Sequence, residues 1–193
     1  MHQRDGADRG ILSGLSFMIA IKKSGKIWLP IIFLLVIIGV SLFIPFKEAL
    51  VFEHQNQGKI MAYLGIKIKD RFTIRYTHSV HLTPVIEDYY VNEKNEIVQT
   101  KETYERFGIG MPNNAIGDEI FTHKGNKYII SNMHRVFPYI DLRVGQVVAN
   151  HTLIFKGKSY RIADFTGEGT WVRMKVRKIN LWEMMKGVNI IGR

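Results

Sequence analysis

The sequence predicts an all-β fold, with a single N-terminal transmembrane helix followed by one compact extracytoplasmic β-sandwich or barrel-like domain that has a short C-terminal helix. Two observations lead to this prediction. An uncharged apolar run occupies residues 27–46. From residue 49 onward, short runs rich in Val, Ile, Thr, Tyr and Phe alternate with turn residues, which is typical of a sandwich or barrel. The predicted parts are a basic segment at 1–26, an anchor at 27–46 and a β domain at 49–193.

Length and composition limit the classes of protein to which the chain can belong. Its 193 residues are enough for one ordinary domain and an appendage, and the 46% apolar content excludes a disordered chain. There is no cysteine, so disulfide frameworks, CxxC redox motifs and cysteine zinc sites are excluded. The net charge of +10 favours contact with anionic lipid headgroups, cell-wall polymers, nucleic acid or acidic ligands. Because the charge is spread along the chain, it does not support nucleic-acid binding.

The run IWLPIIFLLVIIGVSLFIPF, residues 27–46, has the length and composition of a transmembrane helix. At about 1.5 Å per residue, such a helix crosses a hydrocarbon core of about 30 Å. Residues 1–26 carry five basic and two acidic side chains, whereas Lys47 and Glu48 after the run cancel. The positive-inside rule then places 1–26 in the cytoplasm and the β domain outside the cell membrane.

Two other interpretations of this run are weaker. A cleavable signal peptide has a shorter apolar region, about 7–15 residues, and a small-residue cleavage site, which the exit SLFIPFKEALVFE lacks. A buried core helix is a poor match to a long uncharged run with a basic flank. A second apolar stretch, Ile11–Ile21, is too short to span a bilayer.

The β domain is expected to consist of short strands joined by tight turns. HKGNKY and FKGKSY have the sequences of hairpin turns, and VNEKNEI that of a hairpin loop. Only the tail NLWEMMKGVN has a helical pattern, with Asn180 as its cap and Glu183 three residues later. This tail would pack against the β domain or rest on the membrane surface. The expected strands are 50–54, 59–68, 71–79, 84–92, 96–107, 119–125, 127–133, 139–144, 151–157, 158–165 and 170–179.

The stretch FTIRYTHSVHLTPVIEDYYV contains two polar exceptions on otherwise apolar strand faces. Alternation places His78 on the apolar face of one strand and Glu87 on that of the next. A four-residue loop, 81–84, would set His78 directly opposite Glu87, with Cβ atoms about 4.5–5.5 Å apart. A buried carboxylate is costly unless it is paired, and a neighbouring imidazole can share its proton. Ser79 would add a hydroxyl near the turn.

Four interpretations of this pair stay open. It is a structural pair that sets the strand register, a pocket for a small polar ligand, a metal site completed by His81 or His134, or an acid–base pair. The metal site is weakened because His78 and His81 point to opposite faces. No GxSxG, HExxH or other nucleophile motif supports catalysis. No metal and no other cofactor is therefore expected.

A second unusual stretch is RFGIGMPNNAIGDE, residues 106–119. Gly108 and Gly110 allow a close approach of backbone or a positive φ. No helical pattern follows, so this is not a Rossmann or P-loop fingerprint. It is either a plain loop between strands or a loop whose backbone N–H groups line the same pocket as His78 and Glu87.

These two stretches together resemble the domain of unknown function 1850 family. The resemblance covers roughly residues 49–155, and His81 departs from it, because many members are expected to have an acidic residue there. This departure puts a shared charge pattern around the loop in doubt. The positions that match the family motif are His78, Ser79, Val80, Pro84, Glu87, Gly108, Gly110, Met111 and Pro112.

The resemblance implies a small exported or membrane-anchored protein of unknown activity. It also implies an association with tripartite, TRAP-type transporters of the TAXI class, and hence an accessory role in solute uptake beside transporter subunits or a solute-binding protein. The expected function is that of a membrane-anchored extracytoplasmic binding or interaction domain, not an enzyme. The alternatives are an envelope enzyme with a His–Glu acid–base pair and a purely structural envelope protein. The candidate ligand-binding residues are His78, Ser79, Glu87, Gly108, Gly110 and Met111.

Overall fold

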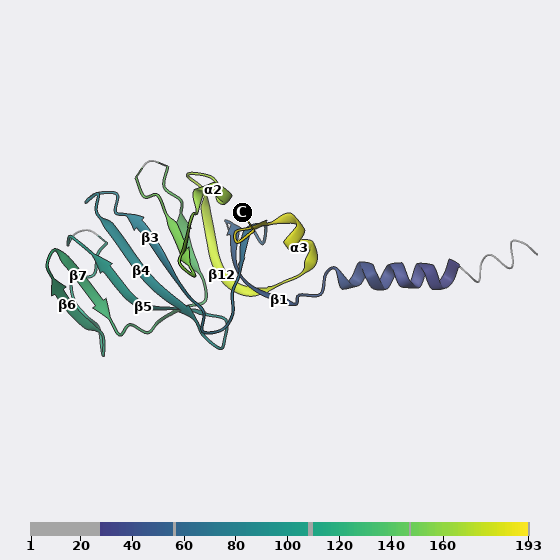
Figure 1. Ribbon diagram of the computed structural model, residues 1–193, viewed down its shortest axis with the longest axis horizontal. Helices are drawn as coiled ribbons and strands as arrows, with labels where there is room; N and C mark the ends of the chain where they lie inside the picture. The colour runs from purple at the N-terminus through teal and green to yellow at the C-terminus, as the bar shows by residue number, and fades with distance from the viewer. Residues whose placement is uncertain (1–27, 56, 108–109, 147, 193) are drawn as a thin grey trace, which may run out of the picture. The chain divides into compact units, whose positions relative to one another are not determined.

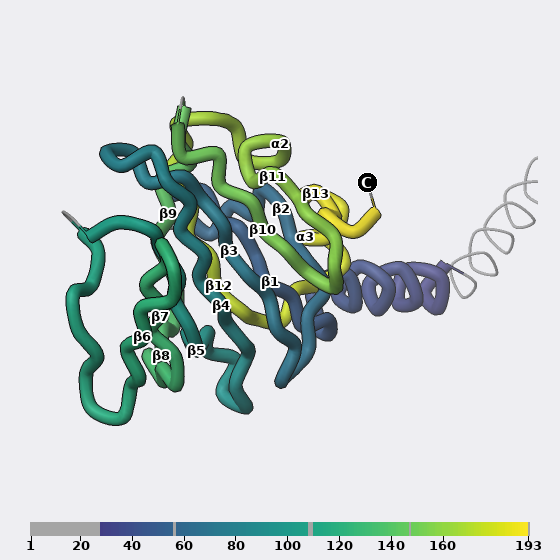
Figure 2. Tube along the Cα trace, turned by 60° about the vertical axis from the view of Figure 1, so that its left-hand side comes forward, coloured from purple at the N-terminus to yellow at the C-terminus, as the bar shows by residue number. Residues whose placement is uncertain are grey.

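The structure, a computed structural model, describes residues 28–55, 57–107, 110–146 and 148–192 (Figures 1 and 2). The chain divides into two compact units, Met1–Ile44 and Pro45–Arg193. The predicted cytoplasmic segment 1–26 and the first residue of the predicted anchor lie outside the described residues.

In the first unit, residues 28–41 form a helix whose large apolar side chains are mostly exposed. Within the described ranges, no helix combines the length and the apolarity needed to cross a membrane. Residues 42–44 follow the helix as a turn.

The second unit is built from two β-sheets, as Figure 1 shows. In its described part, one sheet has five strands in the order β13-β2-β1-β12-β9. The other has eight, in the order β11-β10-β3-β4-β5-β7-β6 with β8 paired to β5. The predicted all-β fold with a short C-terminal helix is confirmed. The elements are β1 Lys47–His54, β2 Ile60–Gly65, β3 Arg71–Thr77, β4 Pro84–Val91, β5 Ile97–Tyr104, β6 Ile120–Lys124, β7 Lys127–Ser131, β8 Arg135–Phe137, β9 Ile140–Arg143, β10 Thr152–Phe155, β11 Lys158–Arg161, α2 Ala163–Thr166, β12 Trp171–Ile179, α3 Leu181–Lys186 and β13 Val188–Asn189.

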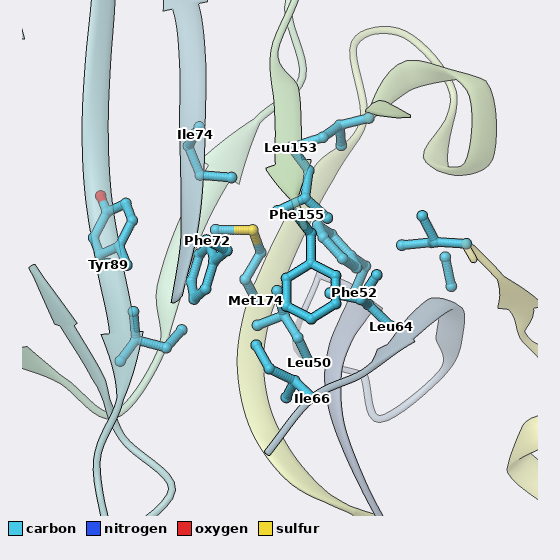
Figure 3. Packing of buried hydrophobic residues seen from close by; sticks show 14 of the residues in the cluster. Leu50, Phe52, Leu64, Ile66, Phe72, Ile74, Tyr89, Leu153, Phe155 and Met174 are labelled. Atoms are coloured by element: carbon cyan, nitrogen blue, oxygen red, sulfur yellow. The ribbon is translucent and has the colours of Figure 1, made fainter. Parts of the chain in front are cut away.

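The main hydrophobic core lies between the two sheets (Figure 3). Alternation along each strand directs one set of apolar side chains inward. The five-stranded sheet contributes Leu50, Phe52, Leu64 and Met174, and the eight-stranded sheet contributes Phe72, Ile74, Tyr89, Leu153 and Phe155. Two sheets packed face to face through such a core form a sandwich rather than a single closed barrel.

Helix α3 packs on a smaller core through Met184, which contacts a cluster that contains Ile60, Tyr63 and Ile179. Its N-terminus has the predicted capping box, because Asn180 accepts from the Glu183 backbone and Glu183 accepts from the Asn180 backbone. This short helix is held by its cap, by the packing of Met184 and by an ion pair between Arg177 of β12 and Glu183 at 2.8 Å.

The structure also corrects the predicted elements. The run 158–165 was expected to be one strand, but β11 ends at Arg161 and α2 begins at Ala163. Two short strands, β8 and β13, were not predicted. Strands of two or three residues carry too few alternating positions to be recognised from sequence.

Candidate functional site

The predicted pairing of His78 with Glu87 is wrong. In the β3–β4 pair, Thr77 lies opposite Pro84 and Ile74 lies opposite Glu87. The connection between the strands therefore comprises residues 78–83 and is two residues longer than predicted. The acid–base pair and the structural pair that were considered for His78 and Glu87 both lose their geometric basis.

His78 has a local role in this turn. Its Nδ1 atom accepts from the backbone N–H groups of Val80 and His81, each at 3.3 Å, and its ring stacks on the ring of His81 at 4.8 Å. Its own backbone N–H donates to Thr83, and Leu82 takes a positive φ of 53°. The imidazole satisfies backbone donors that would otherwise lack partners in a tight turn, which explains a polar residue at the strand end.

Glu87 has different partners. The Tyr89 hydroxyl donates to Oε2 at 2.7 Å, and the Tyr76 hydroxyl lies 3.4 Å from Oε1. On the adjacent strand β5, the residue directly opposite Glu87 is Glu102. Two carboxylates therefore face each other across an antiparallel pair, an arrangement that is destabilising when both are charged.

A β-bulge in β5 completes this cluster. Asp88 pairs with Lys101 and Tyr89 pairs with Gln99, so one residue of β5 is left over between them. An extra residue shifts the alternation, and bulges of this kind re-aim side chains. Gln99 and Glu102, three residues apart, consequently share the inward face, where Gln99 Nε2 donates to Glu102 Oε2 at 3.4 Å.

These side chains line a cleft of about 730 Å³ between the two sheets. One wall comes from β3, β4 and β5 of the eight-stranded sheet, and the other from β9 of the five-stranded sheet. The volume lies in the range of pockets for small molecules. The lining residues are Tyr76, Glu87, Tyr89, Gln99, Glu102, Gly110, Met111, Pro112, Arg135, Phe137, Ile140, Asp141, Leu142, Arg143 and His151.

The structure separates the predicted site residues into two groups. Glu87, Gly110 and Met111 line the cleft together. His78 and Ser79 belong to the β3–β4 turn and are not among the lining residues, and Gly108 lies outside the described residues. The loop is held at the cleft by the Tyr104 hydroxyl, which donates to the backbone carbonyl of Pro112.

Burial controls the protonation of the two carboxyls. It raises the pKa of Glu87, although the hydroxyls of Tyr89 and Tyr76 oppose this by stabilising the charged form. Burial and then the Glu87 charge raise the pKa of Glu102 to about 7. Burial, reinforced by Glu87, raises the pKa of both tyrosines, so they stay neutral hydrogen-bond donors. Near neutral pH, the pair accordingly retains a proton for part of the time.

His151 is the other unusual group in the cleft. It is 7% exposed, its ring stacks on Tyr76 at 5.2 Å, and its Nδ1 atom has no hydrogen-bond partner among the described residues. Burial lowers its pKa to about 4, so the imidazole is neutral at physiological pH. Most buried polar atoms in proteins have a hydrogen-bond partner, so a buried nitrogen without one is an exception. This nitrogen can form a hydrogen bond with a bound molecule.

The two arginines that line the cleft differ in their ion pairs. Arg135 donates to both carboxylate oxygens of Glu119, at 2.8 and 2.9 Å. Arg143 is exposed and lines the same cleft, and it forms no ion pair with another described residue. Asp141, beside it in β9, is bound by Arg173 at 2.7 Å through two hydrogen bonds.

Within the described part of the chain, no group of three or more His, Asp or Glu side chains is placed to hold a metal ion. The cleft instead offers carboxyl, hydroxyl, amide and imidazole groups around a partly apolar floor. The sequence patterns indicated Glu87 and the loop that contains Gly110 and Met111. They did not indicate Tyr76, Gln99, Glu102 or His151. Nothing local in the sequence marks the bulge that brings Gln99 and Glu102 together.

The hydroxyl of Tyr89 supports the Glu87 carboxylate, so Tyr89→Phe is expected to lower the free energy of unfolding by about 1–2 kcal/mol at pH 8. The effect should shrink in acid, where the carboxyl is protonated. Urea unfolding of the variant and the wild type, at pH 8 and in acid, tests this expectation. Tyr90→Phe, on the opposite face of β4, is the matched control, and equal losses in the two variants would contradict the assigned role.

Residues 72–162 match the model of a family described as "Domain of unknown function (DUF1850)". This match supports the family resemblance that the motifs indicate, and it contains every residue that lines the cleft. Neither the curated proteins nor the solved structures contain a match to the chain.

Proposed function

We propose that this chain, with its DUF1850 match, is an extracytoplasmic binding module whose cleft takes a small polar molecule that bears an ammonium or similar cationic group. The observation that carries the proposal is the facing pair of Glu87 and Glu102 inside the cleft. A cation between two carboxylates removes their mutual repulsion and replaces the proton that they otherwise retain.

The rest of the cleft is consistent with a small ligand of mixed polarity. The unpartnered Nδ1 of His151 and the Gln99 amide supply neutral hydrogen bonds beside the carboxyls. Arg143 on the β9 wall is suited to an anionic group at the other end of the ligand. An amino-acid-like molecule, with an ammonium and a carboxylate, has this distribution of charge.

The proposal extends to the cellular setting. Residues 27–46 would anchor the chain in the membrane, with the β domain on the outer side. The resemblance to the family supports an accessory role beside a TAXI-class TRAP-type uptake system. In that setting, the module would bind the transported solute or its solute-binding protein.

The test is thermal unfolding of the full chain in detergent with amino acids, linear diamines, dicarboxylates, neutral sugars and divalent metals. An ammonium compound at about a hundred times its Kd should add about 2.7 kcal/mol to stability. Its affinity should fall by up to about tenfold per pH unit below pH 7, because binding must displace the Glu102 proton.

Matched variants decide whether the cleft is responsible. Glu87→Gln and Glu102→Gln should abolish the stabilisation, whereas Glu93→Gln, on the exposed β4–β5 turn, should retain it. A dicarboxylate that stabilises the chain more at pH 5.5 than at pH 7.5 would contradict the ammonium assignment.

A further inference from the structure

We infer that the ligand cleft binds an extended peptide segment, which pairs with the open edge of strand β9 and places a lysine side chain between Glu87 and Glu102. The inference rests on the proposed function, because the lysine ammonium is the cationic group that the two carboxylates bind. It adds the kind of molecule that carries this group. Strand addition of this type draws affinity from backbone hydrogen bonds and specificity from side-chain pockets.

Strand β9 lies at the edge of its sheet. In the order of the five described strands, β12 is its neighbour on one side, and no strand follows on the other. The cleft is lined by all four residues of β9, Ile140–Arg143. Successive side chains of a strand point to opposite faces of the sheet, so a cleft over one face would be lined mainly by every second residue. The cleft therefore runs along the open edge of β9.

The hydrogen-bond pattern shows which backbone groups face this edge. Val144, directly after β9, donates its backbone N–H to the carbonyl of Thr170 at 2.9 Å, on the side of β12. Hydrogen-bonded and non-hydrogen-bonded pairs alternate along an antiparallel ladder, so Leu142 also bonds toward β12. The backbone N–H and C=O groups of Asp141 and Arg143 consequently point away from β12, toward the open edge.

The neighbouring strand β12 shows the same alternation. Its residue Trp171 lies opposite Arg143. The Trp171 carbonyl accepts from the backbone N–H of Gln55 at 3.2 Å, on the side of β1. The backbone of Trp171 thus faces β1 rather than β9. The pair of Arg143 and Trp171 is therefore a non-hydrogen-bonded one, which leaves the Arg143 N–H and C=O directed at the cleft.

A peptide strand added at this edge has one position that faces the carboxylates. Its residues opposite Asp141 and Arg143 exchange backbone hydrogen bonds with β9, and the residue between them lies opposite Leu142. Residues directly opposite each other place their side chains on the same face. Leu142 packs against the core between the two sheets. The peptide residue opposite Leu142 therefore points toward the eight-stranded sheet.

A lysine at this position matches the wall that it faces. Glu87 and Glu102 line the cleft from that wall, and they lie directly opposite each other. Sheets packed face to face lie about 10 Å apart, and an extended lysine side chain reaches across much of this distance. Phe137 and Ile140 are partly buried and supply apolar surface for its four-carbon stem. The ammonium then lies between the two carboxylates and relieves their repulsion.

The experiment measures binding to the full chain in detergent by titration calorimetry. The probe is alanyl-alanyl-lysyl-alanyl-alanine with an acetylated amino terminus and an amidated carboxyl terminus, so that its one ammonium group is that of the lysine side chain. Butylamine, which has the same length as this side chain, is the comparison. We expect the peptide to bind at least about tenfold more tightly than butylamine, because it adds backbone hydrogen bonds to β9. Glu87→Gln should abolish the binding of both compounds.

Methylation of peptide nitrogens tests the strand pairing itself. The alanines on either side of the lysine have their N–H groups directed at β9, so methylation of these two nitrogens should weaken binding by about tenfold. The N–H of the lysine residue points away from β9, so methylation of that nitrogen is the matched control and should change the affinity less than about twofold. Norleucine in place of the lysine removes the charge and should weaken binding at least about tenfold.

Each other result overturns a defined part. Equal affinities of butylamine and the peptide, or of the two kinds of methylated peptide, would overturn the strand pairing and leave the ammonium site of the proposed function in place. Equal affinities of the norleucine and lysine peptides would overturn the placement of lysine between the carboxylates. Absence of binding by both butylamine and the peptide would overturn the proposed function together with this inference.

Discussion

Glu102→Gln is expected to make the domain more stable than the wild type by up to about 3 kcal/mol at pH 8, with little difference below pH 4.5. The folded state raises the pKa of Glu102 from 4.5 to about 7. The folded chain then binds this proton more tightly than the unfolded chain does. The associated stability is complete below pH 4.5 and is lost as the pH rises to about 7, at about 1.4 kcal/mol per pH unit.

His151 has the opposite effect on the pH dependence. Its pKa falls from 6.5 to about 4 on folding, so the stability that it contributes is present above pH 6.5 and is lost as the pH falls to about 4. Between pH 4.5 and 6.5, the two groups oppose each other in the wild type. Stability should therefore rise with pH in Glu102→Gln and fall with pH in His151→Asn, relative to the wild type.

Urea unfolding from pH 4 to pH 8, followed by circular dichroism without added ligand, measures both slopes. Glu93→Gln serves as the control, because it removes an exposed carboxylate from a hairpin turn and should leave the wild-type profile unchanged. Profiles of Glu102→Gln and His151→Asn that run parallel to the wild type would refute the burial of these groups.

Phe72→Ala is expected to lower the free energy of unfolding by about 3–4 kcal/mol. Phe72 is 2% exposed, lies between the two sheets and stacks on Tyr89 at 5.2 Å (Figure 3). Its removal leaves a cavity in the core and withdraws support from the ring whose hydroxyl holds Glu87. Urea unfolding measures the loss of stability. The dependence of that stability on pH shows whether the cleft has loosened around Glu87.

Phe72→Leu is the matched variant, because it keeps an apolar side chain of similar size. It should cost less than about 1.5 kcal/mol. If Phe72→Ala lowered the free energy of unfolding no more than Phe72→Leu does, this result would contradict the packing of Phe72 between the two sheets.

Local patterns in the sequence were sufficient to predict most of the strands. The hairpins β6–β7 and β10–β11 form at the predicted turns, with positive φ at Gly125 and Gly157. The capping box of α3 forms as expected from Asn180 and Glu183. Period-two alternation, turn residues and caps are properties of neighbouring residues, so they can be read without knowledge of the fold.

The candidate site could be predicted only in part. Glu87 was recognisable because a carboxylate on an apolar strand face is an exception that needs an explanation. Glu102 was not, because only the bulge in β5 turns it to the side of Gln99. His151 was not, because its burial depends on Tyr76 of a distant strand.

The sequence by itself determined that this chain has an uncharged apolar run followed by an all-β domain, and which face of β3 and β4 is buried. The tertiary structure decided the register, the bulge and the cleft. The predicted and observed registers of β3 and β4 differ by four positions, with Glu87 opposite Ile74 instead of His78. An even slip leaves every side chain on the same face, so alternation cannot detect it. Only the closure of the turn by His78 and the packing of the two sheets select the partner that Glu87 meets.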